Sequence, residues 1–176
     1  MRKFTTVSPK LWTSRRFRAL SSDDARLLYL FLMTGPYQNI AGVFPLMDAI
    51  PQELLGWDAA RYTKARQKLV EGEMICFDEV TGEIMVRRWF QNTIEKAPSP
   101  KTYIGAQRTL AEDVESETLR EAALAELEDA WANAAKANAN KAAIRAKAES
   151  FATGRPMSLT ELKGGPLKGG KRESRA

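Results

Sequence analysis

The side chains that could carry function in this chain are those of lysine, arginine, glutamine and threonine. Histidine is absent, and there is no second cysteine to pair with the first. The 176 residues include no histidine and one cysteine, Cys76. Without histidine the chain lacks the usual nucleophilic triads and most kinds of zinc site. One cysteine forms neither an internal disulfide nor a cysteine-rich metal cluster. We therefore expect a protein that acts by binding rather than an enzyme, with no cofactor and no metal.

A patterned set of polar residues lies between residues 59 and 72. Arg61, Lys64 and Lys68 recur at spacings of three and four, which places them on one face of a helix, and Thr63 and Gln67 flank them. Basic side chains neutralise phosphates, whereas hydroxyl and amide groups make directional hydrogen bonds to base edges. The set predicts contact with double-stranded DNA, with affinity from the cations and selectivity from the other two. An ordinary solvated helix face is the alternative.

Two pairs of adjacent arginines extend the candidate set. Arg15 and Arg16 belong to residues 1–20, which carry six basic side chains and no acidic one. Arg87 and Arg88 lie on the second strand of an expected hairpin, and whichever points outward can reach the DNA backbone or the minor groove. The candidate DNA-binding residues are therefore Arg61, Thr63, Lys64, Gln67, Lys68, Arg87, Arg88, Arg15 and Arg16.

The net charge of +5 is unevenly distributed along the chain. Residues 1–20 carry +6 and residues 136–176 carry +7, whereas residues 99–135 carry −5. Basic blocks separated by acidic ones favour one surface that faces a polyanion and another that does not. Basic ends that are merely solvated are the alternative interpretation.

The elements that must position these residues are mostly helical. Residues 8–20 are predicted to form one helix, with Ser8 as its cap and Pro9 in its first turn. A second helix is predicted over residues 24–34, capped by Ser22 or Asp23, and it is apolar nearly all round. That composition indicates the central buried helix of the domain.

Two more helices are expected to precede a hairpin. Apolar spacing predicts a helix over residues 45–55, in which Pro51 requires either a kink or a late start that leaves it in the first turn. Asp58 is predicted to cap the helix over residues 59–72. The residues of this helix that share the buried face are Tyr62, Ala65 and Leu69.

Strand-like segments are short and bounded by turn residues. A strand is predicted near residues 40–44, and residues 74–78 and 83–89 are predicted to form a hairpin in which Gly82 supplies a positive φ. Alternation on these two strands predicts that the packed positions are Ile75, Phe77, Ile84 and Val86.

The remainder of the chain is predicted to be helical and then disordered. After a proline-containing linker over residues 91–100, one helix follows Ser99 and another begins near Thr118. Residues 132–148 are helical on alanine content but have little to bury. The last segment, residues 153–176, is rich in glycine and basic residues and reads as a disordered basic tail.

These elements give a fold class and three parts. The fold is predicted to be mostly α with a small β-hairpin, a winged helix-turn-helix followed by C-terminal helices. Residues 1–98 form the DNA-binding domain, residues 99–152 a helical extension and residues 153–176 the tail. The sequence contains neither a transmembrane run of about 18 apolar residues nor a recognisable secretory signal. We therefore expect a cytoplasmic protein without membrane contact.

A set of short segments between residues 7 and 110 carries a family resemblance. It consists of Trp12, Phe17, Leu20 and Ser21 followed by residues 25–32, 39–44, 54–57, 69–75, 86–90 and 99–101. Their ordered combination resembles the N-terminal winged helix of phage and prophage replication organisers, the replication initiators of temperate phages. Pro51 departs from the family pattern, which has a helix former at this place.

The resemblance implies a role in DNA replication. It implies that the winged helix binds origin DNA and that the variable C-terminal part recruits a replicative helicase or its loader. Two alternatives remain open. A transcriptional regulator of the same fold would bind promoter DNA and form a homo-oligomer through residues 103–131. A protein-interaction module or inhibitor would instead dock a protein through its acidic helices or its tail.

Overall fold

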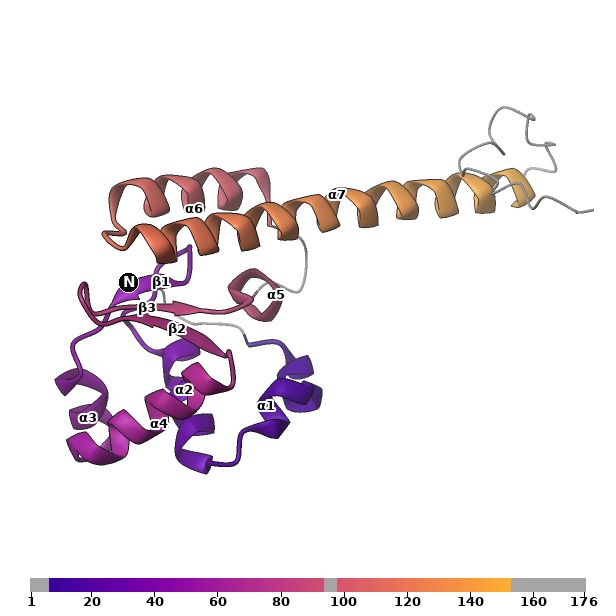
Figure 1. The fold of residues 1–176 in the computed structure, drawn as a ribbon. Helices are drawn as coiled ribbons and strands as arrows, with labels where there is room; N and C mark the ends of the chain where they lie inside the picture. Colours follow the sequence, from indigo (N-terminus) through magenta and orange to yellow (C-terminus); the bar gives the residue numbers. More distant parts are fainter. Residues whose placement is uncertain (1–6, 94–97, 153–176) are drawn as a thin grey trace, which may run out of the picture. The chain divides into compact units, whose positions relative to one another are not determined.

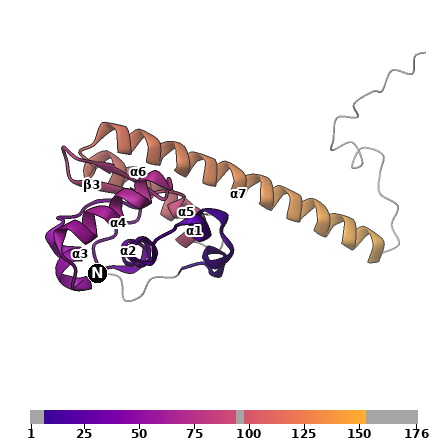
Figure 2. The same ribbon diagram turned by 60° about the horizontal axis from the view of Figure 1, so that its bottom comes forward.

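Helices flank both faces of a small antiparallel sheet (Figure 1, Figure 2). The computed structural model describes residues 7–93 and 98–152. The chain divides into two compact units, Met1–Ala135 and Lys136–Ala176, each considered by itself. The elements are η1 (Pro9–Thr13), α1 (Arg15–Ala19), α2 (Asp23–Thr34), β1 (Val43–Pro45), α3 (Ala49–Leu55), α4 (Ala59–Glu71), β2 (Ile75–Asp78), β3 (Glu83–Val86), α5 (Trp89–Thr93), α6 (Pro100–Glu112) and α7 (Glu117–Ala152).

The sheet has the strand order β1-β3-β2, so the last strand in sequence is the central one. Both of its neighbours pair with it in the antiparallel sense, which places Ile84 between Phe44 and Phe77. Gly82 closes the hairpin with φ +68°, as predicted. The mostly helical fold with a small β component is confirmed.

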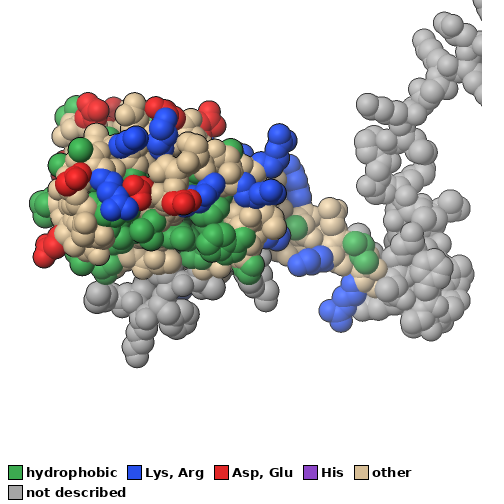
Figure 3. Space-filling model, turned by 90° about the horizontal axis from the view of Figure 1, so that it is seen from below, with side chains coloured by type: hydrophobic (Ala, Val, Ile, Leu, Met, Phe, Trp, Pro, Cys, Tyr) green, Lys and Arg blue, Asp and Glu red, His purple; other side chains and the backbone are tan. Residues whose placement is uncertain are grey.

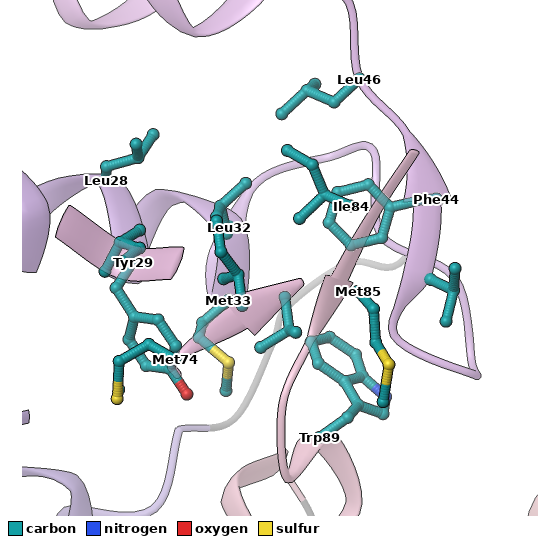
Figure 4. Packing of buried hydrophobic residues seen from close by; sticks show 14 of the residues in the cluster. Leu28, Tyr29, Leu32, Met33, Phe44, Leu46, Met74, Ile84, Met85 and Trp89 are labelled. Carbon is teal, nitrogen blue, oxygen red and sulfur yellow. The ribbon is translucent and has the colours of Figure 1, made fainter. Parts of the chain in front are cut away.

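Both faces of the sheet are buried, although alternation predicted only one packed face. Every residue of β3 is buried. Ile84 points toward Leu32 of α2, and Met85 points to the other side, toward Trp89 (Figure 4). The second face is covered because α6 and the first part of α7 lie across it (Figure 1). Of the four positions predicted to be packed, Ile75, Ile84 and Val86 are buried and Phe77 is half-buried. Glu83 and Met85, which point to the other face, are buried as well.

The single helix expected over residues 8–20 is wrong, because the chain breaks at Ser14. This residue has extended backbone angles, φ −62° and ψ 125°, and it separates η1 from α1. The Ser14 hydroxyl accepts a hydrogen bond from the amide of Phe17 at 3.5 Å. A serine that caps a new helix competes locally with continuation of the preceding one.

The following helices begin close to their predicted starts. Ser22, not Asp23, caps α2, since its hydroxyl accepts from the amide of Ala25 at 3.3 Å. The helix α3 begins late, at Ala49, and Pro51 therefore lies in its first turn without a kink. Proline is tolerated there because the amides of a first turn have no partner within the helix.

The compact unit extends past the expected domain boundary at residue 98. Ser99 caps α6 as predicted, and its hydroxyl accepts from the amide of Thr102 at 3.2 Å. Residues 89–93, expected as strand end and linker, form α5 instead. The tail predicted over residues 153–176 lies outside the described residues. The α6 and α7 residues in the hydrophobic core are Ala106, Leu110, Leu119, Ala123 and Leu127.

The loop before β1 is held by one asparagine and one tryptophan. The Asn39 side-chain oxygen accepts from the amides of Ala41 at 3.0 Å and Gly42 at 2.9 Å. The Trp89 indole donates to the carbonyl of Ile40 at 3.1 Å. Gly42 has φ +74°, and a Cβ atom added to it would lie 2.4 Å from the Trp89 ring. The close approach of loop and ring therefore requires glycine here.

Two acids of the hairpin hold the turn that leads into α7. The carboxylate of the buried Glu83 accepts from the amides of Glu115 at 3.1 Å and Ser116 at 2.7 Å. The Ser116 hydroxyl donates to Asp78 at 2.5 Å, and this hydrogen bond is the main reason that the pKa of Asp78 is lowered. Polar contacts therefore fix the hairpin to the start of α7.

Removing the Ser116 hydroxyl is expected to raise the pKa of the Asp78 carboxyl toward its ordinary value of 3.8. A lowered folded-state pKa adds stability above the unfolded value, and this stability is lost as pH falls through the folded value. Ser116→Ala should therefore destabilise the protein more at neutral than at acid pH. The check is an NMR titration of the Asp78 carboxyl with Thr118→Ala as the control. An unchanged midpoint in Ser116→Ala would contradict the assignment.

Candidate nucleic-acid interface

The helix α4 is capped at its N-terminus and packed along one face. Asp58 caps it as predicted, with its carboxylate accepting from the amide of Arg61 at 2.7 Å. The helix contacts α2 and α3, and it lies on the side of the sheet away from α6 (Figure 1). The residues that α4 buries are those predicted from the sequence, Tyr62, Ala65 and Leu69.

Opposite this buried face, three of the predicted residues are exposed together. Thr63, Lys64 and Gln67 are exposed, and no described residue forms a hydrogen bond or ion pair with their side chains. Figure 2 shows α4 on the face that this view turns forward. The exposed face of α4 therefore offers one ammonium, one hydroxyl and one amide to a ligand.

Arg61 contacts the protein as well as solvent. Its guanidinium forms a two-pronged ion pair with Asp24 of α2, at 2.9 Å from Nε and 2.7 Å from Nη2. It also lies 4.8 Å from the ring centre of Trp57. The hydrogen bond from Arg61 holds the pKa of the Asp24 carboxyl below its ordinary value. Arg61 thus joins α2 to α4, a role that helical spacing did not predict.

Lys68 is also paired, with Glu71 one turn further along α4 at 2.7 Å. Of the three cations predicted for one helix face, Lys64 alone forms no ion pair within the described part of the chain, although its charge helps to lower the pKa of Asp24. Exposed ion pairs of this kind contribute little to stability because solvent screens them. Lys68 and Arg61 can therefore exchange their carboxylates for a phosphate at small cost.

Arg87 and Arg88 follow the hairpin strand rather than lying on it, since β3 ends at Val86. Arg87 is held by Glu126 of α7, with 2.5 Å between its Nε and the carboxylate, and by Cys76 Sγ at 3.7 Å. This ion pair raises the pKa of Arg87. Arg88 has φ +57°, and its amide donates to the same Glu126 carboxylate at 2.5 Å. Arg88 is exposed, whereas Arg87 is half-buried.

The two arginines of α1 differ in environment. Arg15 is exposed, whereas Arg16 is half-buried. Burial, and next the charge of Arg88, lowers the pKa of Arg16. The structure thus brings Arg16 and Arg88 together although 72 positions of sequence separate them. Sequence reasoning included both residues without predicting that they meet.

A further arginine of α4 was missed, and it is structural. Arg66 forms an ion pair with Asp48 at 2.6 Å, and its guanidinium lies 3.9 Å from the ring centre of Phe77. It therefore links α3, α4 and β2 from the inner side of the helix. Arg66 follows the buried Tyr62 by four residues and precedes the buried Leu69 by three, and this helical spacing was the available signal that it lies toward the inner side.

The face that carries α1 to α4 is mixed in charge (Figure 3). Lysine and arginine side chains are interspersed with acidic ones around an apolar area, so the surface has no uniform positive field. DNA contact here would depend on a few defined side chains more than on the summed charge.

Other kinds of site find little support in the described residues. No group of three or more cysteine or acidic side chains there is arranged to hold a metal ion. The acidic stretch that ends α6 and starts α7 is a junction between the helices. None of the described helices combines the length and apolar character needed to cross a membrane.

Comparison with models of protein families, with curated protein sequences and with solved structures finds no match for this chain. The function must therefore be argued from the side chains and their arrangement.

Proposed function

We propose that the N-terminal part of the chain is a winged helix-turn-helix that binds double-stranded DNA through α4. The order α2, β1, α3, α4, β2, β3 supports this proposal, as does the central position of β3 in the sheet. In such folds the second helix of the pair enters the major groove. The short connection from α3 to α4, with Gly56 at φ +67°, fits a tight turn between the two helices.

The observation that carries the proposal is the exposed face of α4. Thr63, Lys64 and Gln67 are unengaged by the described protein, while the opposite face of the same helix is fully buried. A major groove accepts a helix and presents donors and acceptors along base edges. In this proposal Gln67 and Thr63 read base edges, and Lys64 neutralises a phosphate.

In this proposal the tip of the β2–β3 hairpin does not contact DNA through basic residues, as the wing of a winged helix can. The tip carries Glu79 and Val80, both exposed, so it offers no cation to DNA. Arg87, at the end of the hairpin, is held by the ion pair with Glu126 of α7. Contact with the DNA backbone from this side therefore falls to Arg88 and, from the neighbouring α1, to Arg15 and Arg16.

The biological role that we propose is that of a phage-type replication organiser. It rests on the ordered segments that resemble this family. In this role the N-terminal part binds origin DNA, and the C-terminal part recruits a replicative helicase or its loader. Residues 99–135 carry a net charge of −5, which is unfavourable for contact with DNA and leaves this segment to bind a protein instead.

Reversing the charge of Lys64 is expected to weaken binding of duplex DNA by roughly tenfold or more, because the change removes a phosphate contact and adds repulsion. The control Lys101→Glu has the same change in net charge but lies on α6, across the sheet from α4 (Figure 1). It should leave affinity within about twofold of the unmodified protein once salt is matched.

The measurement is duplex binding across a salt series, with fragments from around the gene compared with random DNA. Equal affinities for Lys64→Glu and Lys101→Glu would contradict the role of α4. A preferred fragment at a promoter would favour a transcriptional regulator. Absence of binding at low salt would favour the protein-interaction alternative.

A further inference from the structure

A small hollow lies between α1 and the segment that follows β3. Its volume is about 60 Å³, and it is lined by Arg16, Arg87, Arg88, Gln91 and Asn92 among others. This volume suits a few water molecules or one small oxyanion rather than an aromatic ring. The hollow therefore offers space for a compact, strongly hydrogen-bonding ligand.

Arg16 places unused hydrogen-bond donors at this hollow. Its Nε and Nη2 atoms are buried, and neither has a hydrogen-bond partner among the described residues. Leaving a buried donor unpaired is unfavourable, and more so when the donor belongs to a charged group. Ordered water or a bound acceptor would remove that cost.

Arg88 supplies a second guanidinium without a partner in the described part of the chain. Its backbone is held at φ +57° while its amide donates to Glu126. A non-glycine residue in this region is strained, and such residues cluster at functional sites. The fixed backbone conformation of Arg88 sets the direction of its Cα–Cβ bond, and both Arg88 and Arg16 line the hollow.

The acids near the hollow balance only part of this charge. Glu126 is engaged by Arg87. Glu73 attracts Arg16, but burial and the repulsion from Arg88 outweigh it and lower the pKa of Arg16. Positive charge therefore remains in excess in a partly desolvated place, where an anion gains the most.

We propose that the hollow binds one phosphate group, held by the Nε and Nη2 donors of Arg16 and by the guanidinium of Arg88. The planar fork of an arginine matches the oxygen spacing of phosphate, and two such forks bind it from two sides. Carboxylates fit the same donors less fully because they lack a third oxygen.

The neighbouring surface favours the DNA backbone as the source of that phosphate. A second hollow, of about 290 Å³, also contains Arg16 and continues to Lys68, Glu71 and Gly72 at the end of α4. A backbone phosphate that flanks the groove containing α4 would therefore lie near Arg16. This choice of source rests on the proposed function, whereas the phosphate site itself does not.

The first test uses inorganic phosphate and the full chain without DNA. Arginine Nε–Hε signals are followed by NMR as phosphate is added, against chloride at the same ionic strength. We expect saturable shifts of the Arg16 and Arg88 signals in the unmodified protein and in the control Arg18→Gln, on the same short helix. The Arg88 shift should vanish in Arg16→Gln and weaken in Arg16→Lys, which keeps the charge but not the fork.

The second test measures duplex DNA binding with the same variants. Arg16→Gln should weaken binding roughly tenfold and reduce the salt slope by about one, since one phosphate contact is lost. Arg18→Gln should change neither. If phosphate shifts both signals but DNA does not bind, the site stands with free phosphate as its ligand and the proposed function fails. If DNA binds through Lys64 while phosphate produces no saturable shift, the phosphate site is overturned and the proposed function stands.

Discussion

Gly42→Ala should lower the free energy of unfolding by about 4 kcal/mol, from backbone strain and overpacking together. The added methyl would lie 2.4 Å from Trp89 Cγ and 2.6 Å from its Cδ2, and φ at this position is +74°. The ring has little freedom to move, because its indole donates to Ile40 and it packs beside Met85 (Figure 4). Chemical denaturation measures the change.

Gly82→Ala is the matched control for this substitution. Gly82 has nearly the same φ, +68°, but no neighbouring heavy atom lies within 4 Å of the added Cβ. It should therefore show the backbone cost alone, about 1 kcal/mol. If the two variants lose the same stability, contact with Trp89 is not the cause. A smaller penalty for Gly42→Ala in a Trp89→Leu background would confirm the contact.

Glu83→Ala should lower the free energy of unfolding by about 3 kcal/mol, because it leaves buried donors without acceptors. Glu83 is 2% exposed, and its carboxylate accepts from two amides before α7 and from the Thr81 hydroxyl at 3.2 Å. Hydrogen exchange should accelerate at the amides of Glu115 and Ser116. Denaturation measures the total effect.

The exposed Glu79, in the turn of the same hairpin, provides the control. Glu79→Ala removes the same charge without orphaning a donor, so it should change stability by less than about 0.5 kcal/mol. Glu83→Gln keeps one acceptor oxygen, so its loss of free energy of unfolding should lie between those of Glu83→Ala and Glu79→Ala. Equal losses in Glu83→Ala and Glu79→Ala would show that charge, rather than buried hydrogen bonding, is what matters.

Local signals predicted the caps and turns well, since each depends on residues close in sequence. Asp58 as a cap, Pro51 in a first turn and Gly82 at positive φ are examples. The break at Ser14 was missed because a serine within an amphipathic stretch fits either a helix or a new cap.

The contacts that the predicted site residues make within the protein could not be predicted from the sequence. Arg61 pairs with Asp24, which is 37 residues away, and Arg87 with Glu126, which is 39 residues away. Helical spacing identifies which side chains share a face, but it says nothing about which acid the fold brings to each cation. The three unengaged residues of α4 are therefore a structural finding.

The covered second face of the sheet has a practical consequence for dissecting the protein. A chain shortened at residue 98 would lose α6 and α7, and it would expose Met85, Val43 and the acceptor oxygens of Glu83 to solvent. Such a fragment should aggregate or bind surfaces nonspecifically, imitating a partner interaction. Deletion variants that test the proposed DNA binding and the proposed helicase recruitment should therefore end after Ala135, where the first compact unit ends.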